Sequence, residues 1–155
     1  MNSITLIGMP GCGKSSLGAY LARRSGREFI DLDREIEART GAPPSKMITQ
    51  MGEAAFREIE CEVTAEIDLR TGLVIATGGG TILRPENVQA LRQNGKLLWV
   101  VRDIACLPTE NRPLSCNLEA LWQARKPAYE HAADEIIYHS EDWKAVQNAA
   151  WEVFA

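Results

Sequence analysis

The chain has 155 residues, of which 45% are hydrophobic and 25% charged, and its formal net charge at pH 7 is −4. This composition is typical of a globular domain that folds around its own core, and the net charge argues against nucleic-acid and anionic-membrane partners, which need a basic face. No apolar stretch approaches the length of a membrane span and the cysteines show no C-x-x-C pairing, so we expect a soluble, cytoplasmic protein with free thiols.

The first stretch of the chain has the pattern of a phosphate-binding loop. The apolar run Ile4–Ile7 leads into Gly8-Met9-Pro10-Gly11-Cys12-Gly13-Lys14-Ser15, which matches G-x-x-x-x-G-K-S, and a helical pattern follows over Lys14–Ser25. Glycines let backbone N–H groups turn toward an anion, and the positive end of the helix dipole faces the same anion. We therefore expect a bound nucleotide, with Lys14 at its β- and γ-phosphates and the Ser15 hydroxyl on Mg²⁺.

Short apolar runs alternate with helical patterns along the rest of the chain. Strands are expected at Ile4–Ile7, Glu28–Asp31, Leu73–Ala76, Lys96–Val101 and Glu135–Tyr138, and helices at Lys14–Ser25, Asp33–Thr40, Pro44–Gln50, Gly52–Leu69, Arg84–Gln93, Leu118–His131 and Asp142–Val153. This alternation predicts an α/β fold with a parallel sheet covered on both faces and ligands beyond the carboxyl ends of the strands. No repeat or linker divides the chain, so we expect one domain over residues 1–155, with a lid at approximately 102–117.

Two carboxylates follow the second predicted strand. Strand alternation places Asp31 and Asp33 on one side of the chain, at the carboxyl end of the strand and facing the expected site. A carboxylate beside bound phosphate can hold Mg²⁺ through water or accept a proton from an attacking hydroxyl. Asp33 could instead cap the helix that follows, and the two roles are compatible.

Other candidate site residues have both a structural and a functional interpretation. Arg57 and Glu60 share one helical face. They could form a surface ion pair, or Glu60 could hold the Arg57 guanidinium so that it points toward a ligand carboxylate. Gly78-Gly79-Gly80 follows a buried strand, as a flexible turn or as backbone that approaches a ligand closely. Arg112 and Arg125 are single arginines that could be surface charges, although Arg112 on a mobile segment could close over phosphates.

Taken together, these residues resemble the shikimate kinase family. The phosphate loop, Asp31-x-Asp33, Phe56-Arg57-x-x-Glu60, Gly78-Gly79-Gly80, Arg112-Pro113-Leu114 and Arg125-x-Pro127-x-Tyr129 occur in that family's order, and the resemblance runs from Ile4 to about Ala133. It implies a three-layer α/β/α P-loop fold with a five-stranded parallel sheet in the order 2-3-1-4-5 and a short lid. It also implies transfer of the γ-phosphate of ATP to the 3-hydroxyl of shikimate, with Mg²⁺ as cofactor, in aromatic amino acid biosynthesis.

The resemblance implies roles for single residues. Arg57 and Arg125 would grip the shikimate carboxylate, with Glu60 orienting Arg57, and Asp33 would be the base. The catalytic residues would be Lys14, Asp33 and Arg112; the nucleotide-binding residues Gly11, Cys12, Gly13, Lys14, Ser15, Ser16 and Arg112; the shikimate-binding residues Asp33, Arg57, Gly79, Gly80 and Arg125; and the Mg²⁺ contacts Ser15 and Asp31.

Two segments on the adenine side depart from the family's pattern. Residues 104–111 contain no arginine or lysine, although the family's lid usually carries a further arginine that packs against adenine, and residues 139–143 lack the proline often seen there. The sequence leaves open whether Arg102 replaces the missing contact. His131 and His139 are interpreted as ordinary solvated or helix-end residues, because no third ligand is spaced for a metal.

Two other functions fit part of the pattern. Another P-loop small-molecule kinase, of the gluconate kinase type or a nucleotide kinase, would share the loop but not the two carboxylate-gripping arginines with Gly78-Gly79-Gly80. A nucleotide-binding regulatory or fusion module without turnover is favoured only by the short lid. The expected partners are ATP, Mg²⁺ and a small-molecule substrate, with no nucleic acid and no membrane, and we expect a monomer or a domain of a larger aromatic-pathway polypeptide.

Overall fold

One parallel sheet organises the chain, whose computed structural model describes residues 2–103 and 118–154. The strands are β1 (Ser3–Ile7), β2 (Glu28–Asp31), β3 (Leu73–Ala76), β4 (Gly95–Val101) and β5 (Glu135–Tyr138). They pair in the order β2-β3-β1-β4-β5, and every pair is parallel. The predicted α/β class and the strand order implied by the resemblance are both confirmed.

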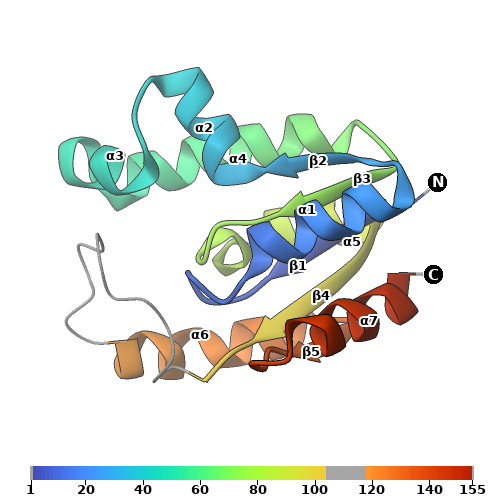
Figure 1. Cartoon of the computed structure of the whole chain (residues 1–155). Coiled ribbons are helices and arrows are strands. Elements are labelled where there is room, and N and C mark those ends of the chain that lie inside the picture. Colours follow the sequence, from blue (N-terminus) through green and yellow to red (C-terminus); the bar gives the residue numbers. More distant parts are fainter. Residues whose placement is uncertain (1, 104–117, 155) are drawn as a thin grey trace.

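The central strand β1 fixes where the phosphate loop leaves the sheet. Its residue Leu6 pairs with Ala76 of β3 and with Leu98 of β4, and its side chain is fully buried. A strand buried on both faces is a continuous apolar run, which explains the short hydrophobic segments in the sequence. Since the strands are parallel, the chain leaves β1, β2 and β3 at the same edge of the sheet, at the left of Figure 1.

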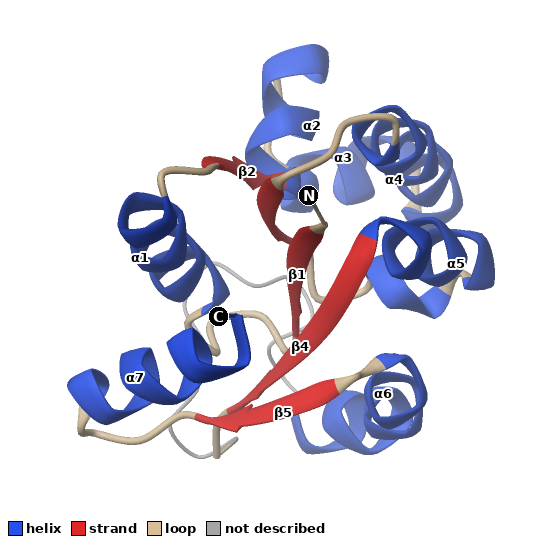
Figure 2. Cartoon of the chain, turned by 90° about the vertical axis from the view of Figure 1, so that its right-hand side faces the viewer, coloured by secondary structure: helices blue, strands red, loops and turns tan. Residues whose placement is uncertain are grey.

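Helices cover both faces of the sheet and form the two outer layers of the fold (Figure 2). Figure 2 shows α1 (Lys14–Ser25) and α7 (Trp143–Phe154) on one side, and α4 (Glu53–Asp68), α5 (Pro85–Asn94) and α6 (Leu118–Ala132) on the other. Two further helices, α2 (Leu32–Thr40) and α3 (Pro44–Met51), continue from β2 and pack against α4. None of the helices in the described ranges combines the length and the hydrophobicity that crossing a bilayer requires.

Every predicted strand and helix is present, with its ends within one residue of the prediction. Among the described residues one element was not predicted, the 3-10 helix η1 (Thr81–Leu83), which joins the glycines to α5. The N–H of Thr81 donates to the carbonyl of Gly78 at 3.4 Å, and that of Leu83 to the carbonyl of Gly80 at 3.1 Å. The segment after β3 is therefore a hydrogen-bonded turn, which favours the interpretation that its backbone approaches a ligand over that of a flexible turn.

Candidate active site

The phosphate loop, residues 8–13, joins β1 to α1 and ends in a left-handed residue. Gly13 has φ 102° and ψ 13°, a conformation that favours glycine, and it directly precedes the first residue of α1. No side chain caps this helix, so the N–H groups of its first turn have no side-chain acceptor. Such a helix start, with its positive dipole end, is suited to an anion such as phosphate.

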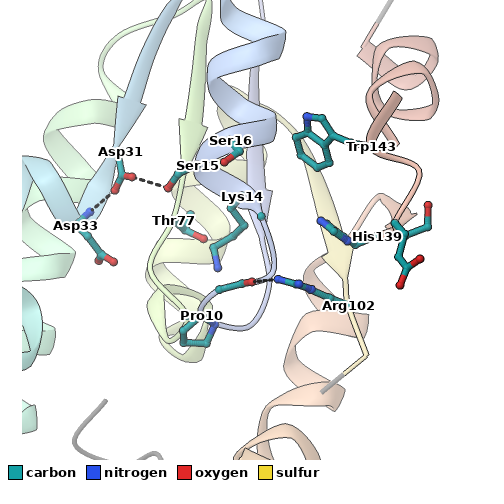
Figure 3. A pocket seen from close by; sticks show the side chains of 15 residues that line it. Pro10, Lys14, Ser15, Ser16, Asp31, Asp33, Thr77, Arg102, His139 and Trp143 are labelled. Carbon is teal, nitrogen blue, oxygen red and sulfur yellow. Dashed lines mark hydrogen bonds between the residues drawn. The ribbon is translucent and has the colours of Figure 1, made fainter. Parts of the chain in front are cut away.

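Lys14 lies folded over this loop. Its side chain is largely buried, and its Nζ donates to the carbonyl oxygens of Gly8 at 2.7 Å and Met9 at 2.9 Å. In Figure 3 the amine lies between the carboxylates of β2 and α2 on one side and Arg102 on the other. The loop therefore already holds its cation at the place where phosphates would bind.

Cys12 belongs to the loop through its backbone. Its N–H donates to the carbonyl of Met9 at 3.2 Å, and its buried thiol lies 3.8 Å from Lys14 Nζ. The thiol packs inside the loop and does not line the cavity above it. A direct contact between Cys12 and the nucleotide stays a prediction.

Asp31 connects the loop to the end of β2. Its Oδ2 accepts from the Ser15 hydroxyl at 2.7 Å, and its Oδ1 accepts from the backbone N–H groups of Asp33 at 3.0 Å and Arg34 at 3.4 Å. Asp31 is therefore the residue that caps α2, and the suggestion that Asp33 does so is wrong. The chain turns helical at Leu32, so Asp33 lies in the first helical turn and strand alternation does not orient it.

The pair formed by Ser15 and Asp31 fits a magnesium ion. Both supply oxygen atoms, which are the ligands that Mg²⁺ prefers, and both line the cavity above the loop. Within the described residues, no group of three or more His, Cys, Asp and Glu side chains could hold a metal. Two protein oxygens are the usual protein share of a magnesium ion that is held mainly by substrate phosphates and water.

Asp33 is a carboxyl group with altered acidity. Burial, and next the negative charge of Asp31, raise its pKa from 3.8 to about 6, while the positive charge of Lys14 opposes this rise. Its carboxylate lies close against the backbone of Gly78, where a Cβ would come within 2.8 Å of Oδ1. A carboxyl with such a pKa is an effective proton acceptor near neutral pH.

Two cavities meet at Asp33. The first, of about 700 Å³, extends from the phosphate loop past Asp31 to Arg102, His139 and Trp143 (Figure 3). The second, of about 320 Å³, lies between α2, α3, α4, α6 and the glycine turn. Since both are lined by Pro10, Asp33 and Gly79, a ligand in one would meet a ligand in the other beside the Asp33 carboxylate.

Two arginine side chains that are largely shielded from solvent line the second cavity. The Arg125 side chain on α6 is 8% exposed and that of Arg57 on α4 is 11% exposed. The Nε–H groups of both are buried and find no hydrogen-bond partner among the described residues. Because a buried unpaired polar group costs free energy, this cavity is suited to a ligand with acceptor oxygens, such as a carboxylate.

The pairing of Arg57 decides between its two interpretations. Its Nη1 donates to Glu60 Oε1 at 2.8 Å, and the Glu60 side chain is only 1% exposed. This is a buried, oriented pair, so the interpretation as a surface ion pair is wrong. A weaker contact to exposed Glu53, at 3.4 Å, leaves the rest of the fork available.

The glycine turn approaches both arginines closely. A Cβ at Gly79 would lie 2.8 Å from Arg125 Nη1, and a Cβ at Gly80 would overlap the Arg57 guanidinium. The Tyr129 hydroxyl, on the same helix as Arg125, donates to the carbonyl of Gly79. Because these positions have no side chains, the backbone of the turn and the two guanidinium groups can line the second cavity side by side.

The far end of the first cavity holds Arg102, whose role the sequence leaves open, and two residues of the segment 139–143 that the resemblance places on the adenine side, His139 and Trp143. Arg102 Nη1 donates to the carbonyl of Gly11 at 2.9 Å, and the rings of His139 and Trp143 lie 5.4 Å apart. Burial, and next the charge of Arg102, lower the pKa of His139. His139 is therefore a cavity residue and not an ordinary solvated one, whereas His131 is exposed at the end of α6 as expected. The signal was its position directly after β5, at the ligand-binding edge of the sheet.

The structure brings most of the predicted residues to one edge of the sheet. Those that line the two cavities are Gly11, Gly13, Lys14, Ser15, Ser16, Asp31, Asp33, Arg57, Gly79, Gly80 and Arg125. Arg112 and most of the predicted lid lie outside the described residues.

Comparison with known proteins gives a consistent result. A family model described as shikimate kinase matches residues 10–153. A shikimate kinase of Burkholderia lata is 38% identical over 146 residues, which cover 87% of this chain and 79% of that protein. One of Bordetella avium is 40% identical over 145 residues, which cover 86% of this chain and 69% of that protein.

Solved structures show the same fold. The structure titled as shikimate kinase from Acinetobacter baumannii in complex with shikimate has a TM-score of 0.89 at 33% identity, covering 99% of this chain and 91% of that one. Shikimate kinase from Aquifex aeolicus has a TM-score of 0.85 at 27% identity, covering 98% and 95%. A gluconokinase from Sinorhizobium meliloti, at 17% identity and a TM-score of 0.54, shares the fold alone.

The altered acidity of Asp33 can be measured directly. We expect the ¹³C resonance of its carboxyl carbon to titrate with a pKa of about 6 in the free protein. In an Asp31→Asn variant the pKa should fall, because one of the two main causes of the rise is removed. A midpoint near pH 4 in the unaltered protein would contradict this environment.

The raised pKa of Asp33 also determines how the stability of the fold depends on pH. Because the pKa in the fold lies above the ordinary value of 3.8, the contribution of Asp33 to stability is complete below that pH and is lost as the pH rises through about 6. Asp33→Asn should therefore raise Tm at pH 8 and change it little at pH 4. Equal changes in Tm at both pH values would be incompatible with a buried, proton-retaining carboxyl.

Proposed function

The chain belongs to the shikimate kinase family, and we propose that it transfers the γ-phosphate of ATP to the 3-hydroxyl of shikimate, giving shikimate 3-phosphate and ADP. The observation that carries the proposal is the pair of buried guanidinium groups, Arg57 and Arg125, facing one small cavity beside Asp33. Two planar forks suit a carboxylate, and a cavity of about 320 Å³ suits a small ring. The neighbouring cavity supplies the place for the nucleotide.

The donor half of the reaction belongs to the phosphate loop. The N–H groups at the start of α1 would bind the phosphates, and Lys14 would exchange its two carbonyl acceptors for β- and γ-phosphate oxygens. When bound, Mg²⁺ would offset phosphate charge, with Ser15 as ligand and Asp31 holding it through water. Lys14 then stabilises the negative charge that moves during transfer.

The acceptor half belongs to the second cavity. Arg57 and Arg125 would bind the shikimate carboxylate, and Gly79 and Gly80 would form the wall against its ring. This orientation would present a hydroxyl to Asp33, where the two cavities meet. Positioning supplies a large part of the barrier reduction in such transfers.

Asp33 would orient the attacking hydroxyl and accept its proton late in the transfer. Phosphoryl transfer has a loose transition state, in which the nucleophile keeps its proton until bond formation is advanced. A carboxyl with a pKa of about 6 is largely ionised at neutral pH and still accepts a proton readily. Arg112, outside the described residues, keeps its predicted role of stabilising the transferred phosphoryl group.

We propose that the base of the nucleotide lies against His139 and Trp143. Both rings line the far end of the nucleotide cavity, and Arg102, bound to the carbonyl of Gly11, lies on the same side of the loop. Burial and the charge of Arg102 lower the pKa of His139, which favours the neutral imidazole, and a neutral ring can stack on a purine. Stacking of this kind would replace the arginine and the proline that the sequence lacks on the adenine side.

We further propose that residues 1–155 form one domain that acts in the cytoplasm, as a monomer or as a part of a larger aromatic-pathway polypeptide. The thiols of Cys12 and Cys61 are free, which suits a reducing compartment. The substrates named above are small molecules, and the proposed chemistry needs no second chain.

A coupled assay of ADP release tests the function. We expect release to depend on shikimate, and Lys14→Ala to reduce it on the order of a hundredfold or more, because a main stabiliser of transferring charge is lost. Lys96→Ala, at the opposite edge of the sheet, is the matched control and should keep full activity. ADP release that depends on gluconate or a nucleoside monophosphate would indicate another P-loop small-molecule kinase. Nucleotide binding without ADP release would indicate a regulatory module.

The proposed roles of the two arginines predict that their substitution changes KM for shikimate but not KM for ATP. Arg57→Lys keeps the charge but loses the fork, so KM for shikimate should rise roughly tenfold or more while KM for ATP stays within about twofold. Arg125→Lys should behave alike. Arg84→Lys, which changes an arginine paired with exposed Glu58, is the control. Equal increases in both KM values for Arg57→Lys would refute a carboxylate-binding role.

The proposed stacking of His139 and Trp143 on the nucleotide base predicts the opposite pattern, in which KM for ATP changes and KM for shikimate does not. Trp143→Ala should raise KM for ATP roughly tenfold and leave KM for shikimate unchanged, because loss of one stacking partner costs about 1–3 kcal/mol. Trp143→Phe should retain most of the affinity. Trp151→Ala, on the same helix but stacked on Phe154, is the matched control. An unchanged KM for ATP in Trp143→Ala would place the base elsewhere.

A further inference from the structure

The buried carboxylate of Glu60 is shared between two structural elements. Its Oε1 accepts from Arg57 on the same helix, at 2.8 Å, and its Oε2 accepts from the Thr81 hydroxyl of η1, at 2.9 Å. Glu60 and Thr81 are 1% and 0% exposed. Because water does not reach this carboxylate, the two bonds determine its orientation, and through Oε1 that of the Arg57 fork.

The Thr81 hydroxyl also holds the glycine turn. Its oxygen accepts a hydrogen bond from the N–H of Gly78 at 3.0 Å, while the same hydroxyl donates a hydrogen bond to Glu60. The backbone of Thr81 is fixed in turn, since its carbonyl accepts from the buried Asn87 side chain at 2.9 Å. A continuous chain of hydrogen bonds therefore connects Gly78, Thr81, Glu60 and Arg57, in which the Glu60 carboxylate accepts from both Thr81 and Arg57.

A hydroxyl is the chemical group that this position requires. The backbone N–H of Gly78 can only donate and the ionised carboxylate of Glu60 can only accept, so the group between them must accept from one and donate to the other. Threonine and serine do both, whereas valine and alanine do neither. Removing the hydroxyl would leave two buried polar groups unpaired.

Both ends of this chain belong to the proposed shikimate cavity. Arg57 would bind the carboxylate at one end, and at the other end Gly78 lies against Asp33, where a Cβ would approach Oδ1 to 2.8 Å. A shift of Gly78 would therefore change the space available to the Asp33 carboxylate. Thr81 itself does not line the cavity, so it would act only through its neighbours.

We propose that Thr81 is a positioning residue for shikimate, the phosphate acceptor. Thr81 would set the distance and orientation between the Arg57 guanidinium, which binds the substrate carboxylate, and the Asp33 carboxylate. This inference rests on the proposed function, because it assigns to shikimate the cavity that Thr81 supports. It adds a residue whose effect reaches the acceptor and leaves the nucleotide site unchanged.

The test compares variants with and without the hydroxyl. Thr81→Val and Thr81→Ala lack it, and Thr81→Ser keeps it. We expect the hydroxyl-free variants to raise KM for shikimate about tenfold and to lower kcat, with KM for ATP within about twofold, and Thr81→Ser to stay within about threefold of the unaltered protein in all three values. Isothermal titration of shikimate should show the same order of affinities without turnover.

Thr64→Val is the matched control. Thr64 is also fully buried, and its hydroxyl donates to Glu60 as well, but to the backbone carbonyl, at 2.7 Å, and not to the carboxylate. Its loss should lower Tm without changing either KM. A general effect of losing a buried hydroxyl near Glu60 would instead change KM in the Thr64 and Thr81 variants alike, which would overturn the proposal.

Two further results would overturn it. One is a folded hydroxyl-free variant whose KM for shikimate stays within about threefold of the original value, and the other is a Thr81→Ser variant as impaired as Thr81→Val. Failure of the proposed function itself is distinguishable, since the unaltered protein would then neither bind shikimate in the titration nor release ADP in response to it.

Discussion

The proposed shikimate cavity depends on how closely the backbone of residues 78–80 approaches the charged groups around it. Side chains at Gly78 and Gly79 would come within 2.8 Å of Asp33 Oδ1 and of Arg125 Nη1. Without them, charged groups from three helices converge on one short turn. These charged groups are largely shielded from solvent, and electrostatic interactions with a bound ligand are stronger in such an environment than in bulk water.

This convergence explains how a chain with a net charge of −4 can hold two anionic substrates. The positive charge is local: Lys14 and Arg125 are 7% and 8% exposed, and both face the edge of the sheet where the strands end. Buried cations need compensation, which Lys14 finds in loop carbonyls and Arg57 in the Glu60 carboxylate. In the proposed reaction, substrate phosphates and a substrate carboxylate would satisfy the donors that remain.

Most of the fold and much of the site could be predicted from the sequence, because short buried strands and helical patterns alternate clearly. The phosphate loop and the three glycines follow directly after strands, and the two arginines belong to motifs that the resemblance identifies. The parts that could not be predicted depend on three-dimensional packing. The capping role of Asp31 depends on where β2 turns into α2, and the burial of Glu60 depends on a hydroxyl from η1. The resemblance places residues 139–143 on the adenine side, but that the His139 ring lines the first cavity depends on how the chain turns after β5.

The central claim is that one cavity binds the acceptor by its carboxylate and presents its hydroxyl to Asp33. A crystal structure of this protein with shikimate and MgADP tests it most directly. The account predicts the substrate carboxylate between the guanidinium groups of Arg57 and Arg125, and a ring hydroxyl within hydrogen-bond distance of Asp33. A shikimate carboxylate bound away from both arginines, or its hydroxyls turned away from Asp33, would contradict the account.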